Sequence, residues 1–168
     1  YLPRGKTAEE VAQEEGLEIQ AAILSYGSYD MYTTSLKGFE KMKNFFWLIS
    51  GSLPRGIFGK SFNAVDNPEM HKAVSPSFNI PMVSERKLPP QLLTSGSDDK
   101  LVTPSSVRNY KEKLESSGQQ VEYWEYEGQS HAYLDSNTKG FFSNNFEINA
   151  PPALDVMIRF LNKVFYKE

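Results

Sequence analysis

Two acidic residues and one histidine follow strand-like segments at positions where they could do chemistry together. Asp98 and Asp99 come directly after an apolar stretch that ends at Gly96, and His131 lies in a loop after an aromatic-rich stretch. A carboxylate bound to one imidazole nitrogen fixes the tautomer of the ring and stabilises the imidazolium, so that the other nitrogen can act as a general base. Spacing alone leaves the alternative of a surface histidine beside a turn aspartate open.

Three segments of the sequence have the character of short strands. Residues 19–27 form a nearly continuous apolar run that ends in glycine, which is typical of a strand buried on both faces. A second strand is expected to start after Pro90 and to end at Gly96. Residues 119–128 alternate well enough to predict a third strand, rich in valine, tyrosine and tryptophan.

Helices are predicted before, between and after these strands. Thr7 and Glu10 form a capping box for a first helix. Thr103 as N-cap, Pro104 at the first helical position and Gly118 at the stop delimit a second helix. Residues 150–165 predict a final helix, whose packing stripe should consist of Leu154, Met157, Ile158, Leu161 and Phe165.

This alternation of helices and strands predicts an α/β protein, with a parallel sheet and flanking helices. The 168 residues, of which 39% are hydrophobic, suffice for one domain. Active groups of such sheets collect at the carboxyl ends of the strands, and neighbouring strands lie about 4.8 Å apart. An acid after the second strand and His131 after the third can therefore meet.

Residues 28–89 are too long for a simple connection between two strands. This segment is rich in aromatic residues and prolines, so we expect short helices that form a lid or a pocket wall inserted between strands. Phe45, Phe46, Trp47 and Phe58 are the candidate substrate-binding residues, and ordinary core packing is the alternative for them.

Composition excludes several other functions. The 18 basic and 21 acidic residues give a net charge of −3, without the basic stripe that nucleic-acid binding requires. The chain has no cysteine, hence neither disulfides nor a thiol nucleophile, and no apolar run approaches the roughly 20 residues that span a bilayer. The cellular compartment stays open.

The second histidine, His71, has no acid motif near it and is expected to be a surface or helix residue. Asp66 and Glu69 are close in sequence, but no metal-ligand spacing appears, so we predict neither a metal nor another cofactor. Asp30 could line a site, although capping a turn is the simpler role for it.

The segment "LPPQLLTSGSDDKLVTPSSVRNYKEKLESSGQQVEYWEYEGQSHAYLD" resembles the acid-to-histidine region of α/β-hydrolases, especially the esterase and lipase branch similar to hormone-sensitive lipase. The family pattern is a strand, G-x-x-D-x-x-V, a helix ending L-x-x-x-G, a strand and G-x-x-H. The matching residues here are Gly96, Asp99, Val102, Leu114, Gly118, Gly128 and His131. The resemblance covers roughly residues 19–165, and it implies that Asp99 rather than Asp98 is the triad acid and that His131 is the base.

The nucleophile of that family lies on a G-x-S-x-G elbow, and no serine of this chain has that surrounding sequence. Ser25 in "ILSYG" comes nearest, but Ile23 occupies the place of the first glycine. The HGGG-type oxyanion segment is also absent. We therefore expect residues 1–168 to be a single partial domain, the C-terminal part of an α/β-hydrolase fold, with the nucleophile encoded before Tyr1.

An incomplete sheet has two expected consequences. The strand near residues 20–26 should present an open edge, which the missing N-terminal portion or a second copy of the chain could cover. The isolated chain should show little esterase activity.

The resemblance implies a carboxylic ester hydrolase acting on small-molecule esters. Short-chain acyl or acetyl esters, including those on carbohydrate, are expected to be the substrates. A serine peptidase similar to prolyl oligopeptidase, which has a related layout of acid, helix and histidine, is one alternative. A non-catalytic hydrolase-like module for binding or assembly is the other.

Overall fold

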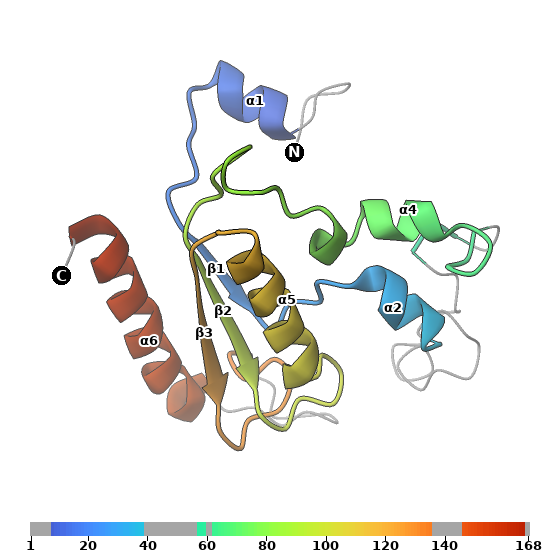
Figure 1. The fold of residues 1–168 in the computed structure, drawn as a ribbon. Coiled ribbons are helices and arrows are strands. Elements are labelled where there is room, and N and C mark those ends of the chain that lie inside the picture. The colour runs from blue at the N-terminus through green and yellow to red at the C-terminus, as the bar shows by residue number, and fades with distance from the viewer. Residues whose placement is uncertain (1–7, 39–56, 60–61, 136–145, 167–168) are drawn as a thin grey trace.

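The computed structural model describes residues 8–38, 57–59, 62–135 and 146–166. Within them, a sheet of three parallel strands has the order β1-β2-β3 (Figure 1). The strands are β1 (Ala22–Ser25), β2 (Gln91–Gly96) and β3 (Val121–Tyr126). The register places Leu93 opposite Tyr123 and Ser25 opposite Thr94. The predicted α/β class, with a parallel sheet and flanking helices, is confirmed.

Helix α5 (Pro104–Ser116) connects β2 to β3 and covers one face of the sheet (Figure 1). Thr103 is its N-cap residue and Pro104 opens the helix, as the sequence predicts, while Gly118 beyond its end has a φ of +76°. The core under α5 contains Leu93, Val107, Leu114 and the stacked rings of Tyr29 and Tyr110, whose centroids are 4.1 Å apart.

Helix α6 (Phe146–Tyr166) lies on the other side of the sheet (Figure 1). The Lys163 ammonium group donates to the Glu122 carboxylate of β3 at 3.0 Å, which ties the helix to that face. The predicted packing stripe is wrong at Leu154, Ile158 and Phe165, which are 44%, 54% and 48% exposed, whereas Met157 and Leu161 are half-buried. The buried side of α6 is instead made by Asn149, Ala150, Ala153 and Phe160.

The physical reason is that α6 carries apolar residues on two of its sides. Periodicity identifies an apolar stripe, but it does not say which of two stripes meets the sheet. The helix also starts at Phe146, before Pro151 and Pro152, instead of at these prolines.

Strand β1 is half-exposed along its whole length, so the prediction of a strand buried on both faces is wrong. In the described sheet β1 pairs only with β2, and it therefore forms the expected open edge. Leu17 and Ile19, which precede it, are 65% and 75% exposed. The apolar residues of this segment therefore lead into a strand that has an open edge in the described sheet.

Strand β2 is buried in all six residues, although half of them are polar. The side-chain hydroxyls of Thr94 and Ser95 each contact a tyrosine hydroxyl, on opposite faces of the sheet. Thr94 Oγ1 lies 2.5 Å from the Tyr133 hydroxyl, and Ser95 Oγ lies 2.7 Å from the Tyr123 hydroxyl. Satisfied hydrogen bonds remove most of the cost of burying these groups. Polar residues can therefore occupy the central strand of the described sheet.

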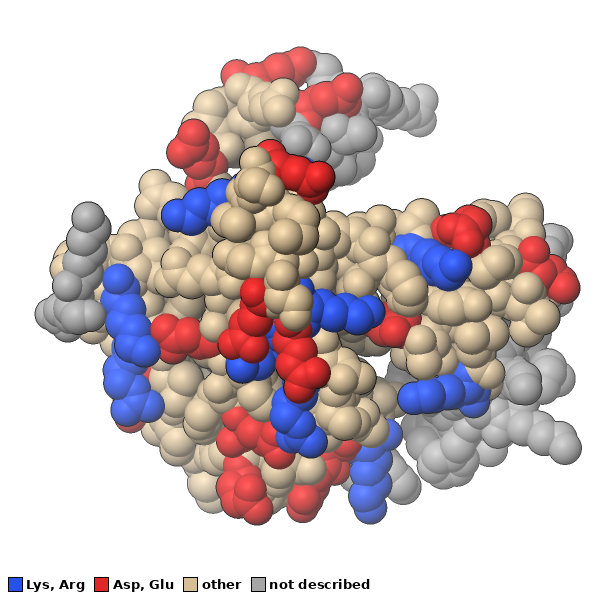
Figure 2. Space-filling model, in the orientation of Figure 1, with Lys and Arg blue, Asp and Glu red and all other residues tan. Residues whose placement is uncertain are grey.

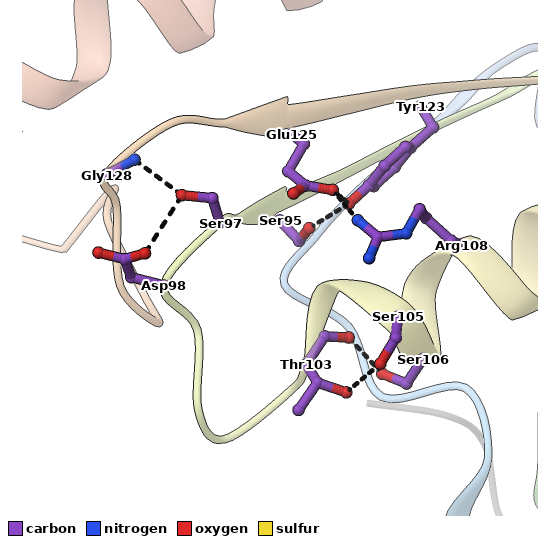
Figure 3. Close-up of polar contacts among 10 residues, drawn as sticks. All are labelled: Ser95, Ser97, Asp98, Thr103, Ser105, Ser106, Arg108, Tyr123, Glu125 and Gly128. Atoms are coloured by element: carbon purple, nitrogen blue, oxygen red, sulfur yellow. Dashed lines mark hydrogen bonds and ion pairs between the residues drawn. The ribbon is translucent and has the colours of Figure 1, made fainter.

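The Tyr123 hydroxyl also donates to the Glu125 carboxylate at 2.6 Å, and Arg108 of α5 pairs with the same carboxylate (Figure 3). Burial raises the pKa of Tyr123 to about 12, and its bond to Glu125 acts in the same direction. The bond from Tyr123, followed by the pairing with Arg108, lowers the pKa of Glu125. This network joins α5 to β2 and β3.

The segment before β2 contains short helices, as predicted for the insertion. They are α2 (Met31–Leu36), α4 (Pro68–Ala73) and the 3-10 turn η1 (Pro76–Phe78), while α1 (Ala8–Glu14) precedes β1. Asp30 caps α2, since its carboxylate accepts from the Thr33 amide at 2.8 Å.

His71 lies in α4 and is fully buried, so it is a helix residue but not a surface one. Its Nδ1 contacts the Asn67 carbonyl oxygen at 3.1 Å, and its ring packs edge-on against Phe58. Residue types and spacing did not indicate this burial, because it depends on how α4 packs against other elements, α2 among them.

Acidic and basic side chains are interspersed on the face shown in Figure 2, without a continuous basic stripe across the coloured part of that face. In the described ranges no helix is long and apolar enough to span a membrane.

Candidate active site

Asp99 lies in the turn after β2, at the carboxyl end of the sheet. Its side chain is fully buried, and its Oδ1 accepts the backbone N–H groups of Leu101 at 2.9 Å and Val102 at 2.8 Å. An aspartate that accepts from amides two and three residues further on stabilises its own turn. The turn therefore fixes the orientation of the carboxylate and leaves Oδ2 directed elsewhere.

That second oxygen contacts His131. The distance from His131 Nδ1 to Asp99 Oδ2 is 2.8 Å, and the imidazole is 19% exposed. A carboxylate can only accept here, so Nδ1 carries the proton and Nε2 is the nitrogen that can take up a proton from a substrate or nucleophile. The neighbouring acid, Asp98, is exposed, and its backbone N–H donates to the Gln129 carbonyl at 2.9 Å.

The loops after β2 and β3 are joined by backbone contacts, which bring the acid and the histidine together. The Gly128 N–H donates to Ser97 Oγ at 2.8 Å (Figure 3), and the Ser97 N–H donates to the Tyr126 carbonyl at 2.9 Å. A Cβ atom on Gly96 would lie only 2.1 Å from the Gln129 carbonyl oxygen. Glycine is therefore required at position 96 because the histidine loop passes directly over it.

A pocket of about 240 Å³ opens beside His131. Part of its wall comes from α2, part from the turn after β2, and part from the loop after β1. The lining residues are Tyr26, Ser28, Met31, Thr34, Leu101, Val102 and His131. The lining is mostly apolar, so the pocket suits a small apolar group next to the imidazole.

The sequence did not identify Tyr26 and Tyr133, which contact the histidine loop. The Tyr26 ring packs edge-on against His131, with centroids 5.4 Å apart, and against Tyr133 at 5.3 Å. Tyr26 directly follows β1 and has an unusual φ of +43°. The only available signal was an aromatic residue directly after a strand and another two positions after the histidine.

The predicted substrate-binding aromatics have separate outcomes. Phe45, Phe46 and Trp47 lie outside the described residues. Phe58 packs against His71, with ring centroids 5.1 Å apart, and it does not line the pocket beside His131. Its assignment to a substrate pocket stays a prediction.

Ser25 is the last residue of β1 and pairs in register with Thr94. It belongs to the regular ladder, in which the following amide, that of Tyr26, donates to the Thr94 carbonyl at 2.7 Å. The next helix, α2, begins only at Met31. A nucleophile elbow needs a sharp turn directly from strand into helix, so the surroundings of Ser25 differ from those of an elbow.

In the described part of the chain, no three His, Cys, Asp or Glu residues come together as a metal site. Independently of that, a carboxylate bonded to an imidazole nitrogen orients the ring and can stabilise its positive charge, an arrangement that is able to support proton transfer.

Residues 5–135 match the family described as having the alpha/beta hydrolase fold, and the chain belongs to this family. Solved structures with a similar fold include esterase 2 of the planctomycete Thermogutta terrifontis. The structure of this esterase phosphonylated by sarin has a TM-score of 0.61 at 19% identity, and covers 98% of this chain and 49% of its own. Its propionate-bound form has a TM-score of 0.58 at 20% identity, with coverages of 98% and 50%.

The native form of the same esterase has a TM-score of 0.57 at 21% identity, and the match covers 98% of this chain and 49% of that one. The present chain thus spans about half the length of these structures. No curated protein matches the sequence.

Proposed function

We propose that this chain supplies the acid and the base of a serine-dependent carboxylic ester hydrolase, in the branch similar to hormone-sensitive lipase. The observation that carries the proposal is the 2.8 Å bond between the buried Asp99 carboxylate and His131 Nδ1, formed at the carboxyl ends of adjacent parallel strands. Membership of the α/β-hydrolase family supports it. The nucleophile and the oxyanion donors belong to residues that this sequence does not contain.

In the proposed reaction, His131 Nε2 removes the proton of the serine hydroxyl as the serine attacks the ester carbonyl carbon. The imidazolium is stabilised by Asp99 through Nδ1, and it then gives its proton to the departing alcohol oxygen. Water attacks the acyl-enzyme by the same route, and the carboxylic acid leaves. Asp99 keeps its negative charge throughout.

Short-chain esters fit the proposed site best. The pocket of about 240 Å³ beside His131 has room for a small acyl or alcohol group. The related esterase 2 structures include a butyrate-bound and a propionate-bound form. The mostly apolar lining favours a simple alkyl or aryl ester over a sugar ester, although acetyl groups on carbohydrate remain within the proposal.

The segment 28–89 forms, in this proposal, a wall of the substrate pocket. Met31 and Thr34 of α2 supply part of the lining beside His131, which supports that role. The open edge of β1 is proposed to pair with a strand of the N-terminal portion of the fold, because β1 has a hydrogen-bonded neighbour on only one side of the described sheet. Pairing with a second copy of the chain is the other arrangement.

The decisive experiment extends the chain with the residues encoded upstream and measures hydrolysis of p-nitrophenyl acetate, butyrate and octanoate. We expect a G-x-S-x-G motif upstream and turnover that is fastest on the short esters. His131→Ala should lower kcat by about 10⁴-fold or more and Asp99→Asn by about 10³-fold or more, whereas Asp98→Asn serves as the matched control with little change. Unchanged turnover in His131→Ala would overturn the proposal.

The chain by itself should turn over a short aryl ester poorly. If it shows robust activity that Ser25→Ala abolishes, the nucleophile has been misplaced. Faster cleavage of a prolyl amide than of an ester by the extended protein would favour the peptidase alternative. A non-catalytic module is the second candidate, because the present sequence lacks a serine elbow. It would be favoured if no elbow is encoded upstream and the extended protein hydrolyses nothing.

A further inference from the structure

Tyr133 lies two residues after His131 and is the largest fully buried side chain of the described residues. Its ring is surrounded edge-on by other aromatic rings, with centroid distances of 5.3 Å to Tyr26, 5.3 Å to Tyr126 and 6.4 Å to Trp124. Its hydroxyl lies 2.5 Å from Thr94 Oγ1. Tyr133 therefore contacts the residue after β1, the middle of β2 and the end of β3.

The residue between the histidine and this anchor has an unusual backbone conformation. Ala132 has a φ of +58°, in the left-handed region that residues with a side chain rarely adopt. Such a conformation persists only where the surroundings over-determine it. Ala132 is held on one side by Tyr133, whose ring packs among other aromatic rings, and on the other side by His131, which is hydrogen-bonded to Asp99.

The Tyr26 ring connects these two sides, because it packs edge-on against both His131 and Tyr133. Both the Asp99 carboxylate at Nδ1 and the Tyr26 ring at its side constrain the imidazole. The Tyr26 ring is in turn held by its edge-on contact with Tyr133. Aromatic edge contacts of this kind have defined geometry, so they restrict rotation as well as adding apolar contact.

We propose that Tyr133 is a positioning residue, which holds the loop at Ala132 and the Tyr26 ring so that His131 Nδ1 stays on Asp99. The proposal rests on the proposed function, since it describes how the base of that reaction is oriented. The phenol hydroxyl matters in addition to the ring. Its bond to the buried Thr94 hydroxyl holds the ring at a fixed depth against β2 and adds to the restriction that the aromatic contacts impose.

The electrostatic surroundings agree with a neutral, hydrogen-bonded phenol. Burial raises the pKa of Tyr133, and the hydroxyl groups of Thr94 and Ser25 beside it act in the opposite direction. The phenol therefore stays protonated over the range in which an imidazole titrates, and its anchoring role does not change there.

The alternative is that Tyr133 is ordinary core packing with no influence on the imidazole. The two ideas differ in a spectroscopic readout, the Nδ1–H proton resonance of His131 in ¹⁵N-labelled protein. A histidine N–H bound to a carboxylate exchanges slowly with water and resonates far downfield. The chain has two histidines, so His71→Gln and His131→Gln variants assign the signals.

The test compares Tyr133→Leu and Tyr133→Phe with Tyr123→Phe in the isolated chain. Tyr123 is the matched control, because its hydroxyl also bonds a β2 hydroxyl, that of Ser95, but on the α5 face of the sheet. We expect exchange of the His131 Nδ1–H to accelerate by at least 10-fold in Tyr133→Leu and by about 3-fold in Tyr133→Phe. Tyr123→Phe should leave it unchanged even though it also lowers stability.

An unchanged exchange rate in a folded Tyr133→Leu variant would overturn the proposal. If that variant does not fold, Tyr133→Phe decides alone, since it keeps the ring and loses only the bond to Thr94. Equal acceleration in Tyr123→Phe would also refute the proposal, because the effect would then reflect general loosening. The readout requires no turnover, so an absence of esterase activity would refute the proposed function without deciding the role of Tyr133.

Discussion

The two histidines of the chain occupy opposite kinds of environment. His131 lies in a turn beyond β3, is 19% exposed, borders a pocket and contacts a carboxylate through Nδ1. His71 lies in α4, is fully buried and contacts the carbonyl oxygen of Asn67 through the same ring atom. Both imidazoles are oriented, but by partners of different charge.

A carboxylate stabilises the charged imidazolium, whereas a carbonyl oxygen mainly fixes the tautomer and the ring orientation. The surroundings of His71 are structural in other respects as well. Ser75 Oγ donates to the His71 carbonyl at 2.6 Å and accepts the Tyr32 amide at 3.0 Å, which joins α4 to α2. His71 thus helps to build the scaffold of the pocket wall, and His131 faces the pocket itself.

The largest expected effect on stability belongs to the histidine away from the pocket. His71→Ala should lower the free energy of unfolding by about 3 kcal/mol, because it leaves a cavity in place of a fully buried ring. His131→Ala should cost about 1 kcal/mol, since water can reach the vacated position at this partly exposed site. Equilibrium urea unfolding of both variants measures the difference, and the reverse order would break the contrast between the two sites.

Gly96→Ala tests whether the loops after β2 and β3 depend on close approach. The new methyl group would meet the Gln129 carbonyl oxygen, so we expect a loss of about 2 kcal/mol and displacement of His131. Gly128→Ala is the control, because open space surrounds it and only its φ of +70° is unfavourable, for a loss of about 1 kcal/mol. Comparable unfolding midpoints for Gly96→Ala and the unmodified chain would show that the loops are not in contact.

Asp99→Asn sharpens the comparison at His131 by removing the charge and keeping the shape. The asparagine oxygen can still accept the Leu101 and Val102 amides, but its NH₂ group would face Nδ1. The imidazole must then move its proton to Nε2, and stability should fall by about 1 kcal/mol. Histidine ¹⁵N shifts report this switch of tautomer. Asp98→Asn should change neither quantity, and a tautomer switch there would exchange the roles of the two acids.

The smallest expected effect is on stability at alkaline pH, and it involves the hydrogen bonds of Tyr123 on the α5 face of the sheet. The pKa of Tyr123 is about 12 in the folded chain against an ordinary 10.0, so its contribution to stability is complete below pH 10 and is lost as the pH rises toward 12. Tyr123→Phe should make the decline of stability over that range shallower without abolishing it, because burial also raises the pKa of Tyr29. Urea midpoints at several pH values measure the slope, and an unaltered decline would argue against this linkage.

The strands and α5 could be predicted because local rules specify them. Proline and glycine delimit β2, and Thr103, Pro104 and Gly118 mark the ends of α5. The face of α6 could not be predicted, since apolar residues lie on two of its sides. The burial of β1 also failed as a prediction, because it depends on which strands flank it and not on its own four residues.

The sequence alone determined the turns at the ends of β2 and β3. Gly96 lets the backbone of the next loop pass close to it, Asp99 stabilises its own turn, and His131 lies in the loop after β3. Residue spacing left both Asp98 and Asp99 open, and the family resemblance favoured Asp99. Only the tertiary structure shows that Asp99 contacts His131 and that Tyr26 and Tyr133 enclose the same loop. The physical reason is range. Turn and capping preferences act over a few residues, whereas these contacts join the ends of three separate strands and exist only once the sheet has formed.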